Sequence, residues 1–287
     1  MKQVTRRSAA EPFPIGAKEN EMTLTEPTAN TSNTLTGRFT GAVDIHSHPL
    51  PAIDDGAHSL ADSLMMLRIA ARFGTVAMIA TPHRYWENGE NTPDKLRHLT
   101  AQVQAALAEK KIGAKIELFP GQEIPLKLNT AFELSHGDVL TLADRGRVAL
   151  VEPPFDRWED WTAKAIKNIV KAGFIPVLAH PERNRVAQQN PDILAEAVDA
   201  GAKFQLTAMS LVGDNGRRAL SAAHAIIERG WATVIASDSH SPKWRPPTMR
   251  SAYFETAAKY GEPTARKLCV ENPAALLRGD EPENPHA

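Results

Sequence analysis

The sequence predicts an α/β fold in which parallel strands close into a barrel, and three observations support this prediction. From Gly41 onward, short apolar runs alternate with longer amphipathic segments, which is the pattern of successive strand–helix units. A histidine or a carboxylate follows nearly every apolar run, and in a parallel barrel the carboxyl ends of the strands gather on one face. The 287 residues, 42% of them hydrophobic, suffice for one such barrel, although their number also allows two domains.

Seven strands are expected, each at a short apolar run that ends in a polar residue, a proline or a turn. They span residues 42–45, 76–80, 115–118, 148–151, 173–179, 203–206 and 233–236. Gly121 follows the third strand and allows the backbone to approach a neighbouring segment closely before Glu123. Two prolines after Glu152 stop the fourth strand.

The helices are expected between these strands. They span residues 59–74, 93–110, 158–172, a segment opened by Pro191, and 213–229. Ser59 can cap the first helix, because Asp62 follows it at the spacing of a capping box.

Residues 1–40 are rich in Thr, Asn, Pro, Ser and charge and have no sustained period, so we expect a disordered arm followed by a single domain over residues 41–287. The arm has basic residues near its start but no apolar central run, so we do not expect a secretory signal. Cys269 is the only cysteine, which excludes an intramolecular disulfide and fits a reducing cytoplasm.

The composition also argues against two classes of partner. The formal net charge of −1 gives no basic surface of the kind that holds nucleic acid. No run of about eighteen apolar residues predicts a membrane span. An oligomer is compatible with the sequence.

The strand ends supply the candidate metal ligands. His46 and His48 are two residues apart, so they project from the same face of an extended chain. Imidazoles and carboxylates together suit divalent transition metals. The candidate ligands are His46, His48, Asp54, Asp55, His83, Glu123, Glu152, His180, Asp238 and His240. They are too many for one ion and suit two or three, and without cations the crowded carboxylates would repel one another.

Other phosphate-processing chemistries lack their motifs. A cysteine-dependent phosphatase needs Cys-x5-Arg, but Ala275 stands where Cys269 would require the arginine. A nucleotide-binding Gly-x4-Gly-Lys loop and a Gly-x-Ser-x-Gly turn are also absent from the sequence.

Several short motifs carry a resemblance to a known family. They are Asp-Ile-His-Ser-His at 44–48, Ile-Asp-Asp-Gly at 53–56, Thr-Pro-His at 81–83, Gly-Gln-Glu-Ile at 121–124, His-Pro-Glu-Arg at 180–183, Ser-Leu-Val-Gly at 210–213, Ser-Asp-Ser-His at 237–240 and Glu-Asn-Pro at 271–273. From about residue 43 to residue 279 the chain resembles the PHP (polymerase and histidinol phosphatase) superfamily, and more closely its bacterial tyrosine-protein phosphatase branch of the CpsB/CapC type. The resemblance implies a distorted (β/α)7 barrel with a trinuclear site that usually holds manganese, with iron, zinc and magnesium as alternatives.

The resemblance also implies how the ligands are shared among three ions. The first ion would be held by His46, His48, Glu123 and Asp238, the second by Glu123, Glu152 and His180, and the third by His83, His240 and one of Asp54 and Asp55. Spacing from His46 favours Asp54 slightly as the ligand, with Asp55 as its support.

The expected chemistry is hydrolysis of a phosphate monoester. Such an ester carries about two negative charges, which a cluster of divalent ions can neutralise while a metal-bridging hydroxide attacks phosphorus. Arg183 and Arg245 are the candidates for binding the phosphoryl oxygens, because a guanidinium matches phosphate geometry. Aromatic residues near the predicted loops are candidate walls of a phosphotyrosine pocket: Tyr85, Trp86, Phe155, Trp158 and Trp244.

We therefore expect a metal-dependent protein-tyrosine phosphatase. By family analogy its substrate is the tyrosine-rich tail of a bacterial tyrosine kinase that controls capsule or exopolysaccharide synthesis. One alternative is a phosphatase of a small ester such as histidinol phosphate, or of a nucleic-acid phosphoester, against which the near-neutral charge argues. Another is a non-catalytic, metal-binding module of the polysaccharide machinery, against which the complete ligand set and Arg183 argue.

Overall fold

The structure is a computed structural model that describes residues 39–87, 89–109 and 116–283. The expected disordered arm, residues 1–40, lies outside the described residues except for its last two positions. The same holds for residue 110 of the second expected helix and residue 115 of the third expected strand. The fold class is confirmed, because the barrel strands are parallel and are connected by helices.

The barrel strands form two parallel sheets. The first has the order β1-β2-β5, with β1 Ala42–Ser47, β2 Thr75–Ala80 and β5 Glu117–Pro120. The second has the order β10-β9-β8-β7-β6, with β6 Glu123–Pro125, β7 Val148–Glu152, β8 Ile175–Ala179, β9 Lys203–Thr207 and β10 Ala232–Ala236. A short antiparallel hairpin, β3 Tyr85–Trp86 and β4 Gly89–Glu90, lies outside them.

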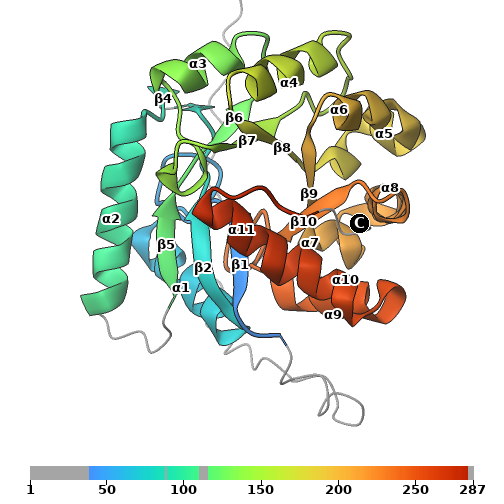
Figure 1. The fold of residues 1–287 in the computed structure, drawn as a ribbon. Helices are drawn as coiled ribbons and strands as arrows, with labels where there is room; N and C mark the ends of the chain where they lie inside the picture. Colours follow the sequence, from blue (N-terminus) through green and yellow to red (C-terminus); the bar gives the residue numbers. More distant parts are fainter. Residues whose placement is uncertain (1–38, 88, 110–115, 284–287) are drawn as a thin grey trace, which may run out of the picture. The chain divides into compact units, whose positions relative to one another are not determined.

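Single bridges join the two sheets at both seams. One bridge pairs Ser47 with Ser239, and the other pairs His83 with Glu123. The strands β5 and β6 are two halves of one segment that changes sheet at Gly121, where a Cβ would lie 2.7 Å from the Ile79 side chain. In the described part of the chain, eight strands thus occupy seven positions around a distorted barrel, as the family resemblance implied, with helices on the outside (Figure 1).

Alternate side chains of the strands fill the interior of the barrel. Val43 and Ile45 of β1 belong to one buried cluster with Ala77 and Ile79 of β2, and residues of β7, β8 and β10 join them. Residues between these, such as those at 151, 178 and 235, belong to the cluster under the outer helices instead. This alternation follows the two-residue period of a strand. We call the first set, together with Leu276 and Leu142, the inner apolar cluster.

The outer helices partly match the expected ones. The expected helices correspond to α1 Leu60–Arg72, α2 Pro93–Glu109, α4 Thr162–Lys171, α6 Ala195–Asp199 and α8 Gly216–Glu228. Ser59 caps α1 by accepting the Asp62 N–H at 3.2 Å. The expected start of α4 at residue 158 is wrong, because the Asn184 amide binds the carbonyls of Pro154 and Arg157 and holds that segment as a loop.

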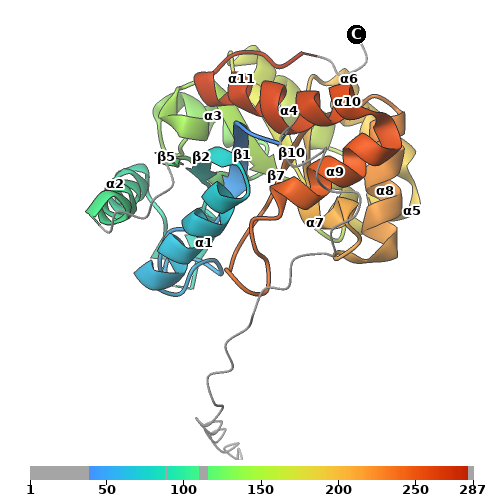
Figure 2. The same ribbon diagram turned by 90° about the horizontal axis from the view of Figure 1, so that it is seen from below.

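Further helices lie where none was expected. They are α3 Thr130–His136, α5 Arg185–Gln189, α7 Ala208–Leu211, α9 Met249–Tyr260, α10 Glu262–Arg266 and α11 Asn272–Arg278. Leu276 of α11 packs into the inner apolar cluster. In Figure 2, α11 lies at one end of the barrel and the loop before α9 lies toward the other. Among the described residues, no helix combines the length and the apolar character needed to cross a membrane.

Candidate metal centre

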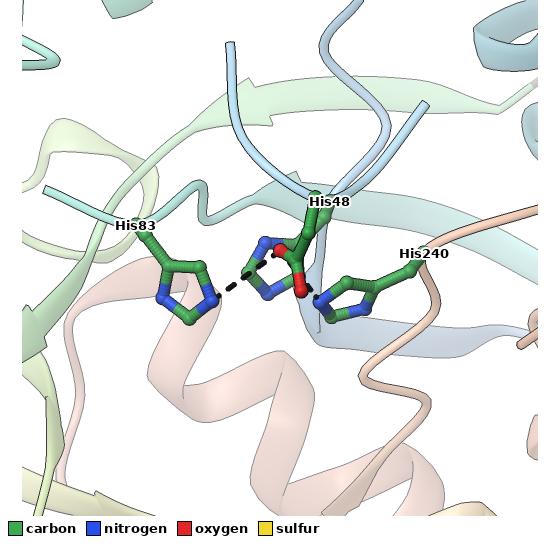
Figure 3. A group of neighbouring side chains, drawn as sticks. His48, His83 and His240 are labelled. Atoms are coloured by element: carbon green, nitrogen blue, oxygen red, sulfur yellow. Dashed lines mark ion pairs between the residues drawn. The ribbon is translucent and has the colours of Figure 1, made fainter. Parts of the chain in front are cut away.

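The strand ends bring histidines and carboxylates together at one end of the barrel. Four overlapping groups have ligand atoms within 4.8 Å of one another: His48, Asp55, His83 and His240; His46, His180 and Asp238; His46, His48 and Glu123; and His83, Glu123 and Glu152. Figure 3 shows the side chains of His48, His83 and His240 converging. The dashed lines mark the ion pairs that His83 and His240 form with Asp55. We call these residues together with Asp54 the metal centre.

His46 and His48, at the end of β1, turn the same nitrogen toward the centre. The Nδ1 atom of His46 lies 2.9 Å from the Gln205 side-chain oxygen, and that of His48 lies 2.8 Å from Asp54. Because both partners are acceptors, each histidine carries its proton on Nδ1 when neutral. The two Nε2 atoms lie 3.3 Å apart, so their lone pairs face the same space. A cation in that space would relieve this repulsion.

Gln205 of β9 is a residue that the sequence reasoning missed. It is fully buried, and its oxygen accepts both the His46 ring N–H and the backbone N–H of His180 at 3.2 Å. A glutamine between Phe204 and Leu206 in an apolar strand was the available signal. A backbone N–H can only donate, so the His180 N–H requires the oxygen of the Gln205 amide, and not its NH2 group, at this position. The His46 Nδ1 atom faces the same oxygen and must therefore carry the proton.

The two neighbouring aspartates have different contacts. Asp54 is buried, and its carboxylate binds the His48 ring and accepts the backbone N–H groups of Gly56 and His83. Asp55 is more exposed, and one oxygen lies 3.5 Å from His83 Nε2 and 3.3 Å from His240 Nε2. The geometry therefore favours Asp55 as a ligand and Asp54 as the support of His48, the reverse of the slight preference from spacing.

Gly56 makes room for this turn. A Cβ atom at this position would lie 2.2 Å from the His48 carbonyl oxygen and 2.9 Å from the Asp54 carboxylate. A side chain here would therefore displace the loop that presents both aspartates.

Glu123 lies at the middle of the centre. Its carboxylate is 3.0 Å from His180 Nε2, 3.0 Å from His83 Nδ1 and 3.4 Å from the Nε2 atoms of His46 and His48. Burial alone would raise its pKa, but the charge of His46 and the hydrogen bonds from the histidines hold the pKa of Glu123 well below its usual range.

Glu152 lies beside this carboxylate. It is 3.7 Å from His180, and its carboxylate belongs with His83 and Glu123 to one of the four sets of ligand atoms that lie within 4.8 Å of one another. Burial, and then the charge of Glu123, raise the pKa of Glu152 to about 7. A second cation near these two carboxylates would remove that repulsion.

Asp238 presents its two oxygens to different partners. Its Oδ1 atom lies 3.4 Å from His46 Nε2, while Oδ2 lies 2.5 Å from an Arg183 nitrogen and 2.6 Å from an Arg245 nitrogen. Burial opposes ionisation, but the charges of His46 and Arg245 hold its pKa below the usual range. Both predicted arginines therefore lie at the edge of the centre, side by side.

The backbone is strained at two of these positions. His180 has φ 33° and Asp238 has φ 52°, a left-handed conformation that residues with a Cβ rarely adopt. The His180 N–H is held by Gln205, and the Asp238 N–H donates to the His46 carbonyl at 2.8 Å. These bonds keep the side chains aimed inward despite the cost.

Asp44 of β1 supports the centre through the loop that follows β10. It is fully buried and accepts the Ser237 backbone N–H at 2.9 Å and the Ser237 hydroxyl at 2.5 Å. Burial raises the pKa of Asp44 to about 6. Asp44 thus links β1 to the loop that carries Asp238, in agreement with a structural role rather than a ligand role.

The aromatic candidates do not share one location. Trp86 stacks on His83 with ring centres 5.7 Å apart, and the Phe155 ring lies 5.1 Å from the Arg183 guanidinium. Trp244 borders a pocket that also contains His240. Tyr85 faces Lys127 instead, and Trp158 binds Glu196 through its indole N–H.

The donor set fits divalent cations. Mixed imidazole and carboxylate ligands suit manganese, iron and zinc, and the overlapping groups provide room for more than one ion. Removing these charged groups from water without cations would be costly, and the raised pKa of Glu152 reports that cost. The arrangement can therefore bind a cluster of cations beside two arginines.

Comparison with known proteins adds a family and several relatives. The family model for "Capsular polysaccharide synthesis, CpsB/CapC" matches residues 42–278. The tyrosine-protein phosphatase YwqE of Bacillus subtilis is 35% identical over 238 residues, covering 82% of this chain and 91% of the relative. The tyrosine-protein phosphatase CpsB of Streptococcus pneumoniae is 30% identical over 240 residues, covering 82% and 98%.

A solved structure is also similar. It is described as "Crystal structures of YwqE from Bacillus subtilis and CpsB from Streptococcus pneumoniae, unique metal-dependent tyrosine phosphatases". It matches with a TM-score of 0.78 and 34% identity, covering 83% of this chain and 95% of the other.

Proposed function

Because the chain belongs to the CpsB/CapC family of capsular polysaccharide synthesis, we propose that it is a metal-dependent protein-tyrosine phosphatase. The observation that carries the proposal is the metal centre itself, in which five histidines and five carboxylates meet at one end of the barrel next to two arginines. The names of the relatives supply the substrate class, since they are tyrosine-protein phosphatases.

The reaction is hydrolysis of a phosphate monoester. Divalent ions, when bound, neutralise the charge of the phosphate and activate the attacking water. The chain orients the imidazoles, because Gln205 and Asp54 accept the Nδ1 protons of His46 and His48 and both Nε2 atoms then point into the centre. Asp55 would serve with His83 and His240, and Glu123 would be shared between neighbouring ions.

Arg183 and Arg245 would bind the phosphoryl oxygens. Asp238 holds both guanidiniums through one oxygen, so their other N–H groups are available at the edge of the centre. The two guanidinium groups would stabilise the transferring phosphoryl group more strongly as negative charge develops on its oxygens. A tyrosyl leaving group has a pKa of about 10, so it depends less on a general acid than an alkyl alcohol does.

Manganese is the proposed ion, and a bacterial tyrosine kinase that controls capsule or exopolysaccharide synthesis is the proposed substrate. The donor set supports manganese, with iron, zinc and magnesium as alternatives. The family description supports a role in polysaccharide synthesis. We propose a cytoplasmic location, in which the chain and the phosphorylated tail of such a kinase would share one compartment.

The test compares three substrates before and after metal is restored. The chain is stripped with a chelator, and hydrolysis of a phosphotyrosyl peptide, a phosphoseryl peptide and histidinol phosphate is measured with and without added Mn²⁺. We expect metal-dependent turnover of the phosphotyrosyl peptide above the other two. Turnover of histidinol phosphate alone would mean that the substrate is a small phosphate ester and not phosphotyrosine. The absence of metal-dependent turnover of all three would refute the proposed phosphatase activity.

A further inference from the structure

A groove opens directly beside the metal centre. Its volume is about 440 Å³, and Asp55 and His240 of the metal centre form part of its lining. One wall is formed by residues 56–58 and by Asp62 in the first turn of α1, and the other is the loop that contains Lys243 and Trp244. Because Asp55 and His240 belong to both, a molecule bound through its phosphate at the metal centre could extend into this groove.

Trp244 stands out on the wall of this groove. Its relative exposure is 83%, the highest among the large hydrophobic residues of the described part of the chain. Covering this aromatic surface with another molecule would therefore be favourable. An indole face stacks well on another aromatic ring, and this contact adds to the gain from burial.

The loop that carries Trp244 is held in place. The Ser241 hydroxyl accepts the backbone N–H groups of Lys243 and Trp244 at 3.1 and 3.3 Å. The backbone N–H groups of His240 and Ser241 both donate to the Arg245 carbonyl, which closes the loop. The indole therefore sits next in sequence to the guanidinium proposed to bind phosphate, on a loop whose ends are fixed to the centre.

We infer that this groove receives the aromatic ring of a phosphotyrosyl substrate, and that Trp244 stacks on the ring while Arg245 binds the phosphate. This inference rests on the proposed function, since it concerns the leaving group of that reaction. Trp244 is then the residue that favours aryl over alkyl phosphates. Lys243, on the same wall, places a positive charge beside the chain that carries the ring.

The experiment separates binding of the ring from binding of the phosphate. Dissociation constants for phenylphosphonate, which carries the ring, and for inorganic phosphate, which does not, are measured by calorimetry on the full chain loaded with Mn²⁺. We expect Trp244→Ala to weaken phenylphosphonate binding about tenfold and to leave phosphate binding unchanged. Trp244→Phe, which keeps a stacking face, should stay within about threefold of the unaltered chain.

Phe132→Ala is the matched control. Phe132 is 59% exposed on α3, does not line the groove and stacks on His136, so its loss should alter neither constant. With the phosphotyrosyl peptide, Trp244→Ala should raise KM about tenfold with little change in kcat.

Three results would overturn the inference. Equal weakening of both ligands by Trp244→Ala would mean that only the phosphate site was disturbed, and no weakening would place the ring elsewhere. A change in oligomeric state with both constants unchanged would assign the indole to contact between copies of the chain. If the unaltered chain does not hydrolyse the phosphotyrosyl peptide, the proposed function fails, while the two binding constants still decide whether the groove takes a ring.

Discussion

The inner apolar cluster and the metal centre occupy successive levels of the same barrel, yet their side chains have opposite character. Both are largely buried and both are presented by β1, β2, β8 and β10 or the residues that follow them. The apolar level is made of alternate strand residues that need no specific partner. In the metal centre, by contrast, individual histidines depend on a particular acceptor, as His46 does on Gln205 and His48 on Asp54.

This difference separates stability from chemistry. Apolar burial stabilises the fold without directional requirements, whereas buried charged groups cost free energy unless they are paired. The left-handed residues His180 and Asp238 belong to the metal centre as well. We therefore expect substitutions in the inner apolar cluster to change mainly the free energy of unfolding, and those in the metal centre to change mainly metal binding and activity.

The largest effect is expected for Glu123→Gln. Its carboxylate contacts four histidines, so an amide there would remove a negative charge and turn a donor toward the cations. We expect kcat to fall about a thousandfold and fewer ions to be bound per chain. Glu117→Gln, an exposed glutamate on β5, is the control. The shared role of Glu123 would be wrong if the variant kept more than a tenth of the activity.

Leu276→Ala should show the opposite pattern. This residue is fully buried in the inner apolar cluster, on the helix α11. Loss of the side chain leaves a cavity and should lower the free energy of unfolding by about 2–5 kcal/mol, measured by urea titration. Metal content and kcat of the folded chain should stay unchanged. A fall in metal affinity larger than the loss of stability would show that the two levels are coupled.

Gln205 lies in an apolar strand but contacts a metal-centre histidine, so its substitution tests whether metal binding depends on a residue outside the ligand set. Gln205→Leu removes the acceptor for the His46 ring N–H, and we expect metal affinity to fall about 10- to 100-fold. Gln205→Glu keeps an acceptor at that position and should recover most of the affinity. Competition with a metal-binding dye measures both. Equal affinity in the leucine variant would show that the tautomer of His46 does not depend on this residue.

Glu182→Gln should change stability alone, and the change depends on pH. Glu182 is fully buried, accepts the Thr207 N–H and the Ser210 hydroxyl, and burial raises its pKa from the ordinary 4.5 to about 7. The unfolded chain therefore loses this proton at lower pH, so Glu182 lowers stability as pH rises from about 4.5 to about 7. The glutamine should remove that loss, at most roughly 3 kcal/mol.

The measurement is the difference in the free energy of unfolding between the two metal-free chains at several pH values. The difference should grow between pH 5 and 7 and then level off. A difference that does not vary with pH would mean that Glu182 is already ionised throughout.

The sequence allowed prediction of the features that repeat along the chain. The parallel strands follow from their apolar runs, and the convergence of His46, His83 and His180 follows from their positions at strand ends. These are properties of the strand period and the barrel topology, so they need no atomic detail.

Other features depended on contacts distant in sequence. The choice between Asp54 and Asp55 depends on where the turn places each carboxylate. The number of residues that separate them from His46 does not determine this placement. Gln205 acts through a partner 159 positions away. The break between β5 and β6 at Gly121 depends on the approach of Ile79, and α9, α10 and α11 had no strand ends to mark them.

The most direct test follows bound metal and activity together. Mn²⁺ is added stepwise to the stripped chain, and bound ions per chain and hydrolysis of a phosphotyrosyl peptide are measured at each step. We expect almost no activity with one ion per chain and full activity with two or three, because Glu123 and its neighbours form overlapping groups. Full activity in the stripped chain, or with a single bound ion, would contradict a cluster of cations as the source of the chemistry.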